Sequence, residues 1–133
     1  MRKISWTEFY NGFENWSLSV QKSCAEDLEE FGASSEVLEI VLVFSLHDKE
    51  YASSFLIKAL DAGVMFTPEE VLELIGEVTT PALSKMAINT SRAFDAEEMA
   101  AISGMVDTLA YDRISSRLPK VQGWECASEL NVE

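Results

Sequence analysis

The sequence predicts an all-α fold, in which an N-terminal amphipathic capping helix is followed by three helix-turn-helix repeats. Three observations predict it: a phrase that occurs twice, an N-terminal stripe of apolar residues at helical spacing, and start and stop signals at the expected helix ends. We expect one domain over residues 1–117, packed as a small α-solenoid or a compact bundle. Its expected parts are a capping helix at 5–31, hairpins at 34–62, 67–91 and 95–117, and then a tail at 118–133.

The repeated phrase begins at Phe66 and again at Phe94. When Phe66–Met86 is placed on Phe94–Ile114 without gaps, seven of the 21 positions are identical. The identical pairs are Phe66/Phe94, Glu69/Glu97, Glu70/Glu98, Gly76/Gly104, Val78/Val106, Thr80/Thr108 and Ala82/Ala110. Self-similarity at such a period is typical of stacked helical hairpins, and three hairpins are about the minimum that buries a continuous core.

The N-terminal element is predicted from eight apolar residues spaced by three or four positions, which is the spacing of one helix face. These are Trp6, Phe9, Phe13, Trp16, Val20, Cys24, Leu28 and Phe31. Ser5 can cap this element, with Glu8 three residues on. It forms either one helix or two that join near Gly12 or Ser17. We expect the stripe to pack across the first hairpin; an exposed aromatic docking groove is the alternative.

The first hairpin is a weaker copy of the repeated phrase. "EVLEI" at Glu36–Ile40 echoes "EVLEL" at Glu70–Leu74, and "DKEYASSFLIKAL" supplies the second helix. In this alignment Ala52 falls on Ala82. Gly63 is expected to end the hairpin, because glycine readily closes a helix end.

The second and third hairpins carry matching helix signals. An N-cap residue is followed three positions later by a glutamate, which completes a capping box, and a glycine then ends the helix before a second N-cap residue. These residues are Thr67, Glu70, Gly76 and Thr79 in the second hairpin, and Asp95, Glu98, Gly104 and Asp107 in the third. Each phrase therefore encodes a complete helix, turn and helix start.

The tail begins at the helix-stopping Pro119 and has no clear period. We expect a loop or partly disordered segment, with Trp124 packed back on the body. The two cysteines, Cys24 and Cys126, are expected to be free thiols, since a cytoplasmic setting disfavours a disulfide between them.

Charge is the most extreme feature of the composition. The chain has 23 acidic and 10 basic residues, a formal net charge of −13. Nucleic acids and anionic membranes should be repelled. The acids either keep the protein soluble or imitate nucleic acid in a basic cleft of another protein. The chain lacks an apolar run long enough for a membrane span and a secretory signal, so a cytoplasmic location is expected.

Motifs for catalysis or cofactor binding are missing from the sequence. His47 is the only histidine, and zinc, calcium and phosphate-loop spacings do not occur. Glutamates in the first turns of helices are accounted for by the helix dipole. We therefore predict a protein that is not an enzyme and that has no cofactor or metal; catalysis by scattered carboxylates is the least favoured alternative.

Three stretches, "SWTEFYNGFENWS", "EDLEEFGASSEVLEI" and "LIKALDAGVMFTPEEVLEL", resemble a group of short helical-repeat proteins from Firmicutes and their conjugative or phage-like elements. The resemblance covers about residues 5–115. The matching residues are Trp6, Phe9, Tyr10, Trp16, Phe31, Gly32, Gly63 and Phe66. The resemblance implies a bacterial or mobile-element origin and a helical-repeat fold, and it implies no activity.

These observations predict a non-enzymatic protein–protein interaction module. The alternative is an acidic phage or mobile-element inhibitor, a nucleic-acid mimic of the anti-defence or anti-CRISPR kind, that binds a basic nucleic-acid-handling enzyme. In either case the first contacts to test are Glu69, Glu70, Glu73, Glu97 and Glu98. The alternatives differ in whether the acids form one continuous face or surround the body.

Overall fold

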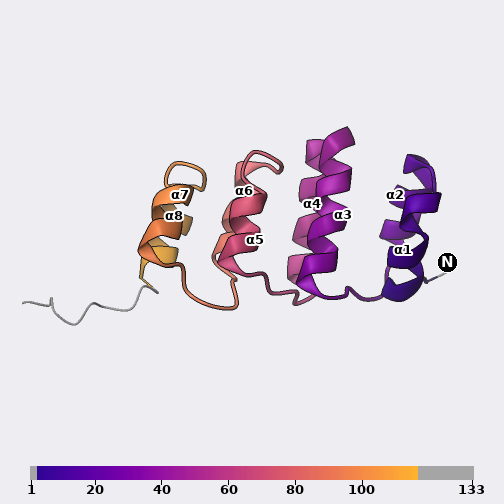
Figure 1. Ribbon diagram of the computed structural model, residues 1–133, viewed down its shortest axis with the longest axis horizontal. Coiled ribbons are helices and arrows are strands. Elements are labelled where there is room, and N and C mark those ends of the chain that lie inside the picture. Colours follow the sequence, from indigo (N-terminus) through magenta and orange to yellow (C-terminus); the bar gives the residue numbers. More distant parts are fainter. Residues whose placement is uncertain (1–2, 117–133) are drawn as a thin grey trace, which may run out of the picture.

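The computed structural model describes residues 3–116, and this part of the chain is all-α, as predicted (Figure 1). Its α-helices are α1 (Trp6–Gly12), α2 (Leu18–Glu26), α3 (Ser34–His47), α4 (Lys49–Asp61), α5 (Pro68–Glu73), α6 (Thr80–Ala87), α7 (Ala96–Ile102) and α8 (Thr108–Ser115). A short 3₁₀ helix, η1 (Phe13–Asn15), follows α1. The predicted tail, with Trp124 and Cys126, lies outside the described residues.

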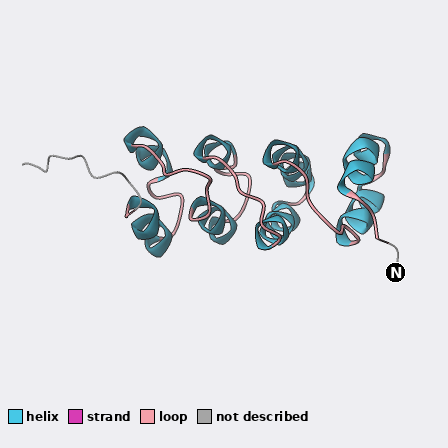
Figure 2. Ribbon diagram, turned by 90° about the horizontal axis from the view of Figure 1, so that it is seen from below, coloured by secondary structure: helices cyan, strands magenta, loops and turns pink. Residues whose placement is uncertain are grey.

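The helices form antiparallel pairs that stand side by side in a row (Figure 1). Seen along the helix axes, the row has two layers (Figure 2). The first-helix layer contains α1, α3, α5 and α7, and the second-helix layer contains α2, α4, α6 and α8. Packing of α4 on α6, α6 on α8 and α5 on α7 joins neighbouring pairs. None of the helices within residues 3–116 is long and apolar enough to cross a membrane.

The N-terminal element is two α-helices and not one continuous helix, which decides between the two alternatives of the prediction. The chain turns back after η1, and the hydroxyl of Ser17 caps α2 by accepting from the amide of Val20. Gly12 permits the turn, because a Cβ there would lie only 2.5 Å from the Trp16 ring. The reversal also changes which side chains face inward: Val20 is 42% exposed, whereas Gln21 is buried and donates to the carbonyl of Phe13 at 2.8 Å.

Most of the aromatic stripe nevertheless packs against the next pair. Phe9 and Phe13 are buried, and their rings meet Phe55 and Phe44 at centroid distances of 6.2 and 5.4 Å. Phe44 also meets Phe55 at 5.4 Å. These rings form the core between the first two pairs, so the packing interpretation of the stripe is confirmed for its buried members.

The predicted helix signals are largely confirmed. Complete capping boxes occur at the starts of α1, α5 and α7, and the three glycines expected to close helices adopt positive φ. Thr79 is an exception, since its side chain makes no capping hydrogen bond. Instead its backbone amide donates to the hydroxyl of Ser53 at 2.8 Å, across the interface between α4 and α6.

Buried serines set the register between pairs. Ser53 lies five residues after the N-cap Asp48 of α4, and Ser84 lies five residues after the N-cap Thr79 of α6. Ser84 likewise accepts from the amide of Asp107, the N-cap of α8, at 2.9 Å. Counted from the N-caps, Ser53 is equivalent to Ser84.

The serine register corrects the predicted alignment of Ala52 with Ala82. Ala52 lies four residues after the N-cap of α4, whereas Ala82 lies three residues after the N-cap of α6. The two alanines are therefore offset by one position. The prediction aligned the two helices only because both contain an alanine, and this placed α4 one residue out of register with α6.

Ser53→Ala is expected to lower the free energy of unfolding by about 1–3 kcal/mol, because the amide of Thr79 loses its acceptor inside the protein. Urea denaturation measures this change. Ser54→Ala removes the same group at an exposed neighbouring position and should change stability by less than about 0.5 kcal/mol. Equal losses in the two variants would contradict the role assigned to Ser53.

Gly32→Ala is expected to lower the free energy of unfolding by about 1–3 kcal/mol, because the new Cβ would overlap the indole of Trp6. Trp6 is 5% exposed and donates from its ring nitrogen to Glu36 at 2.8 Å, so the ring has little room to move. Thermal unfolding and tryptophan fluorescence report the effect. Glu30→Ala, at an exposed position nearby, is the control. Wild-type stability of Gly32→Ala would show that the ring does not rest against Gly32.

Candidate protein-binding surface

Charge is divided between the two layers. The first-helix layer, taken with η1, carries nine acidic residues and no lysine or arginine within its described helices: Glu8, Glu14, Glu36, Glu39, Glu69, Glu70, Glu73, Glu97 and Glu98. The helices of the second-helix layer carry five basic and four acidic residues: Lys22, Lys49, Lys58, Lys85 and Arg113, with Glu26, Glu50, Asp61 and Asp112. The acids of the helices are therefore concentrated in one layer.

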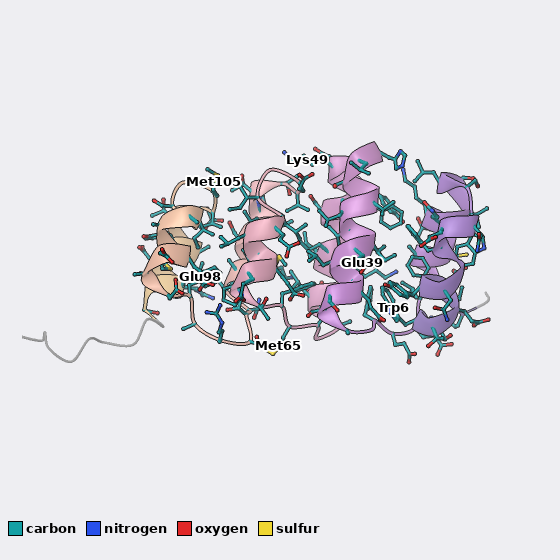
Figure 3. The ribbon with its side chains drawn as sticks, viewed as in Figure 1. Trp6, Glu39, Lys49, Met65, Glu98 and Met105 are labelled. Carbon is teal, nitrogen blue, oxygen red and sulfur yellow. The ribbon has the colours of Figure 1, made fainter. Side chains whose placement is uncertain are left out.

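Six acids of the first-helix layer are exposed: Glu8 on α1, Glu14 in η1, Glu39 on α3, Glu69 and Glu73 on α5, and Glu97 on α7. The last four lie on the consecutive first-layer helices α3, α5 and α7. Figure 3 shows Glu39 on the pair formed by α3 and α4. Glu39 accepts from the hydroxyl of Tyr10 at 2.6 Å. This hydrogen bond, with burial and the nearby negative charges, raises the pKa of Tyr10 to about 12. These exposed carboxylates, Glu39, Glu69, Glu73 and Glu97, are called the acidic face below.

Two of the five predicted contact residues are engaged inside the fold. Glu70 accepts from the amide of Thr67 at 2.8 Å and from the hydroxyl of Ser34 at 3.1 Å, so it links α5 to α3. Glu98 is buried and accepts from the amide of Asp95 at 2.9 Å. Both glutamates hold the stack together, and a partner would reach them only at the cost of these contacts.

Arg92, in the loop between α6 and α7, joins two of the predicted glutamates. Its guanidinium donates to both oxygens of Glu98, at 2.9 and 2.7 Å, and lies 3.0 Å from Glu69. The hydrogen bond from Arg92 holds the pKa of Glu98 below its ordinary value. The pKa of Glu69 is also lowered, first by a hydrogen bond from its own backbone amide and then by Arg92. Arg92 therefore neutralises part of the acidic face.

Glu73 and Glu97 are the predicted residues that remain exposed without a polar contact among residues 3–116. Glu39 belongs to the same face and was missing from the prediction. The sequence contained a signal for it, since the "EVLEI" echo of "EVLEL" places Glu39 on Glu73.

Groups that could support chemistry do not converge in the described part of the chain. Within residues 3–116, no three His, Cys, Asp or Glu side chains are arranged to hold a metal ion. His47 is exposed at the end of α3, and Cys24 is a free, half-buried thiol.

Comparison of the chain with protein-family models, with curated proteins and with solved structures returned no match. The resemblance to helical-repeat proteins of Firmicutes and their mobile elements stays a prediction.

Glu98→Gln is expected to weaken the dependence of stability on pH. The pKa of Glu98 is lower in the folded chain than its ordinary value near 4.5, so its ion pair with Arg92 stabilises the fold above that value. This contribution disappears as the pH falls through the lowered pKa. The variant should therefore be less stable at neutral pH and should lose less stability between a pH of about 5 and about 3.

Urea denaturation at several pH values measures the effect of Glu98→Gln. Glu97→Gln changes the same group at an exposed adjacent position and should retain the wild-type pH dependence. If Glu98→Gln also kept the wild-type slope, the ion pair with Arg92 would not be the source of the pH dependence.

Proposed function

We propose that this chain is a non-enzymatic protein-binding module that uses the acidic face of the first-helix layer to hold a basic partner protein. The observation that carries the proposal is the absence of any lysine or arginine from α1, α3, α5 and α7, whose exposed positions carry Glu39, Glu73 and Glu97. Stacked helical pairs support extended binding surfaces of this kind. The partner would be another protein in the cytoplasm of a bacterial cell.

The division of charge also favours a second candidate function, that of an acidic inhibitor. Carboxylates gathered in one layer could occupy a basic cleft that normally holds nucleic acid, whereas acids spread evenly around the body would serve solubility. The target would be a basic nucleic-acid-handling enzyme, such as a defence nuclease of the host of a phage or mobile element. The mobile-element part of this proposal rests on the resemblance alone.

Neutralising the acidic face should abolish capture of the partner. The triple variant Glu39→Gln, Glu73→Gln, Glu97→Gln removes three exposed charges from the first-helix layer. The matched control, Glu26→Gln, Glu50→Gln, Asp112→Asn, removes three exposed charges from the second-helix layer. Immobilised protein is exposed to a bacterial lysate, and retained proteins are identified by mass spectrometry. We expect retention by the wild type and the control, loss from the first variant, and loss at high salt.

Equal retention by both variants would contradict the acidic face as the binding surface. Added duplex DNA separates the two candidate functions: DNA that displaces the captured protein indicates an inhibitor that occupies a nucleic-acid site. A partner that is retained at high salt and in the presence of DNA would instead indicate an apolar contact.

A further inference from the structure

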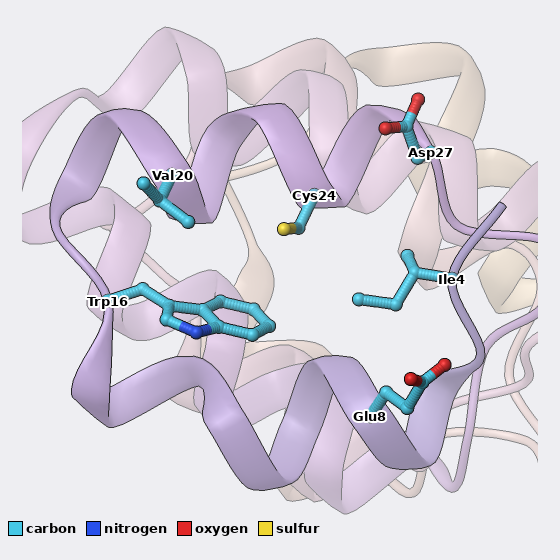
Figure 4. Close-up of a pocket in the computed structure, with 6 residues that line it drawn as sticks. All are labelled: Ile4, Glu8, Trp16, Val20, Cys24 and Asp27. Carbon is cyan, nitrogen blue, oxygen red and sulfur yellow. The ribbon is translucent and has the colours of Figure 1, made fainter. Parts of the chain in front are cut away.

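A groove of about 410 Å³ opens between α1 and α2 at the N-terminal end of the row (Figure 4). It is lined by Ile4, Glu8, Trp16, Val20, Cys24 and Asp27. The Trp16 ring lies flat in the middle of the groove, and Glu8 and Asp27 stand at one end of it. The side chains that α1 and α2 bury against the next pair are different ones, so this groove faces away from the rest of the described row.

The three pairs that follow α1 and α2 indicate which kind of group this end of the row could bind. Glu36, Glu70 and Glu98 each lie three residues after the N-cap of a first-layer helix. Each accepts a donor from the N-terminal side of its own helix: the indole of Trp6, the hydroxyl of Ser34 and the guanidinium of Arg92, respectively. Each of the three pairs that follow α1 and α2 therefore offers a carboxylate to a hydrogen-bond donor that precedes it in the chain.

Glu8 is the equivalent carboxylate of α1, and it lacks such a donor. Its Oε1 accepts from the amide and hydroxyl of Ser5, which completes the capping box. Glu70 uses Oε1 in the same way and keeps Oε2 for Ser34. The Oε2 of Glu8 has no partner among residues 3–116, and Asp27 adds a second carboxylate on the opposite wall of the groove.

At the other end of the row, the described helices carry smaller side chains where α3 buries apolar ones. Leu38 and Val41 lie five and eight residues after the N-cap of α3 and are buried. The equivalent positions of α7 are Ala100 and Ser103, both exposed. On α8, Asp112 and Arg113 are exposed, and Leu109 is 75% exposed. This end therefore presents both signs of charge, whereas the charged side chains that line the N-terminal groove are two acids.

We propose that this groove binds a basic amphipathic segment of a partner protein, with an apolar side chain over Trp16 and separate basic side chains against Glu8 and Asp27. Charge complementarity selects this occupant, because all ionisable groups at the end of the groove are acids. A second copy of the chain is the other possible occupant, since its α8 carries Arg113 and an exposed Leu109; a dimer in sedimentation that Glu8→Gln with Asp27→Asn dissociates would overturn the proposal. The inference rests on the proposed protein-binding function but uses a surface separate from the acidic face.

A synthetic amphipathic helix of leucine and lysine is the probe. Binding is measured by fluorescence anisotropy and mapped by NMR chemical shifts. Glu8→Gln with Asp27→Asn should weaken binding by roughly tenfold, since two charge contacts are lost while glutamine still completes the capping box. Glu73→Gln with Glu97→Gln removes the same charge from the acidic face and should leave the affinity within about twofold. Val20→Lys, at an exposed position, should also weaken binding, because it places a positive charge beside the lysines of the probe.

The shifts should centre on Trp16, Val20 and Cys24. Shifts confined to α5 and α7, equal losses in the two double variants, or equal binding of a leucine–glutamate helix would each overturn the groove proposal. Those outcomes do not contradict the proposal that the acidic face binds a partner. The lysate experiment with its own variants tests that proposal separately. Equal retention by the two triple variants there, with the peptide still bound in the groove, would overturn only the acidic face.

Discussion

The structure depends on the contacts between pairs, because most of its helices are too short to be stable alone. α5 has 6 residues and α7 has 7, well below the roughly 12–15 that an isolated helix needs in water. Apolar burial supplies most of the stabilisation, but it does not fix how the pairs are aligned. Ser53 and Ser84 do so, since each accepts the N-cap amide of the next second-layer helix. The serine hydroxyl of one pair thus accepts a hydrogen bond from a helix-capping amide of the next pair, which has no acceptor within its own helix.

The same stacking produces two layers with different charge. First-layer helices carry a glutamate in the third position, where it caps its own helix and accepts a donor from the chain before it; Glu70 and Glu98 do both. Second-layer helices place cations near their ends, as with Lys58 and Lys85, where the helix dipole favours them. Because acids stabilise the starts of the first-layer helices and cations the ends of the second-layer helices, the described helices of the first layer carry no cation. This layer is the proposed binding surface.

Local features of the fold could be predicted from the sequence, whereas contacts between pairs could not. Capping boxes, such as that of Thr67, and helix-closing glycines involve residues a few positions apart. The reversal after Gly12 was only one of two alternatives, because the apolar stripe continues in phase through it. The engagement of Glu98 depends on Arg92, which carries no sequence signal for this pairing. The acidic face was accordingly predicted in outline, with Glu39 missing from it.

The central claim is that the negative potential lies on the first-helix layer. Paramagnetic relaxation of backbone amides by a cationic and by an anionic nitroxide of the same size measures the potential near each amide without a partner or a mutation. We expect the cationic probe to be enriched most strongly beside α3, α5 and α7, and less beside α4, α6 and α8, with the difference diminishing at high salt. Equal enrichment along both layers, or stronger enrichment beside the second-helix layer, would contradict the claim.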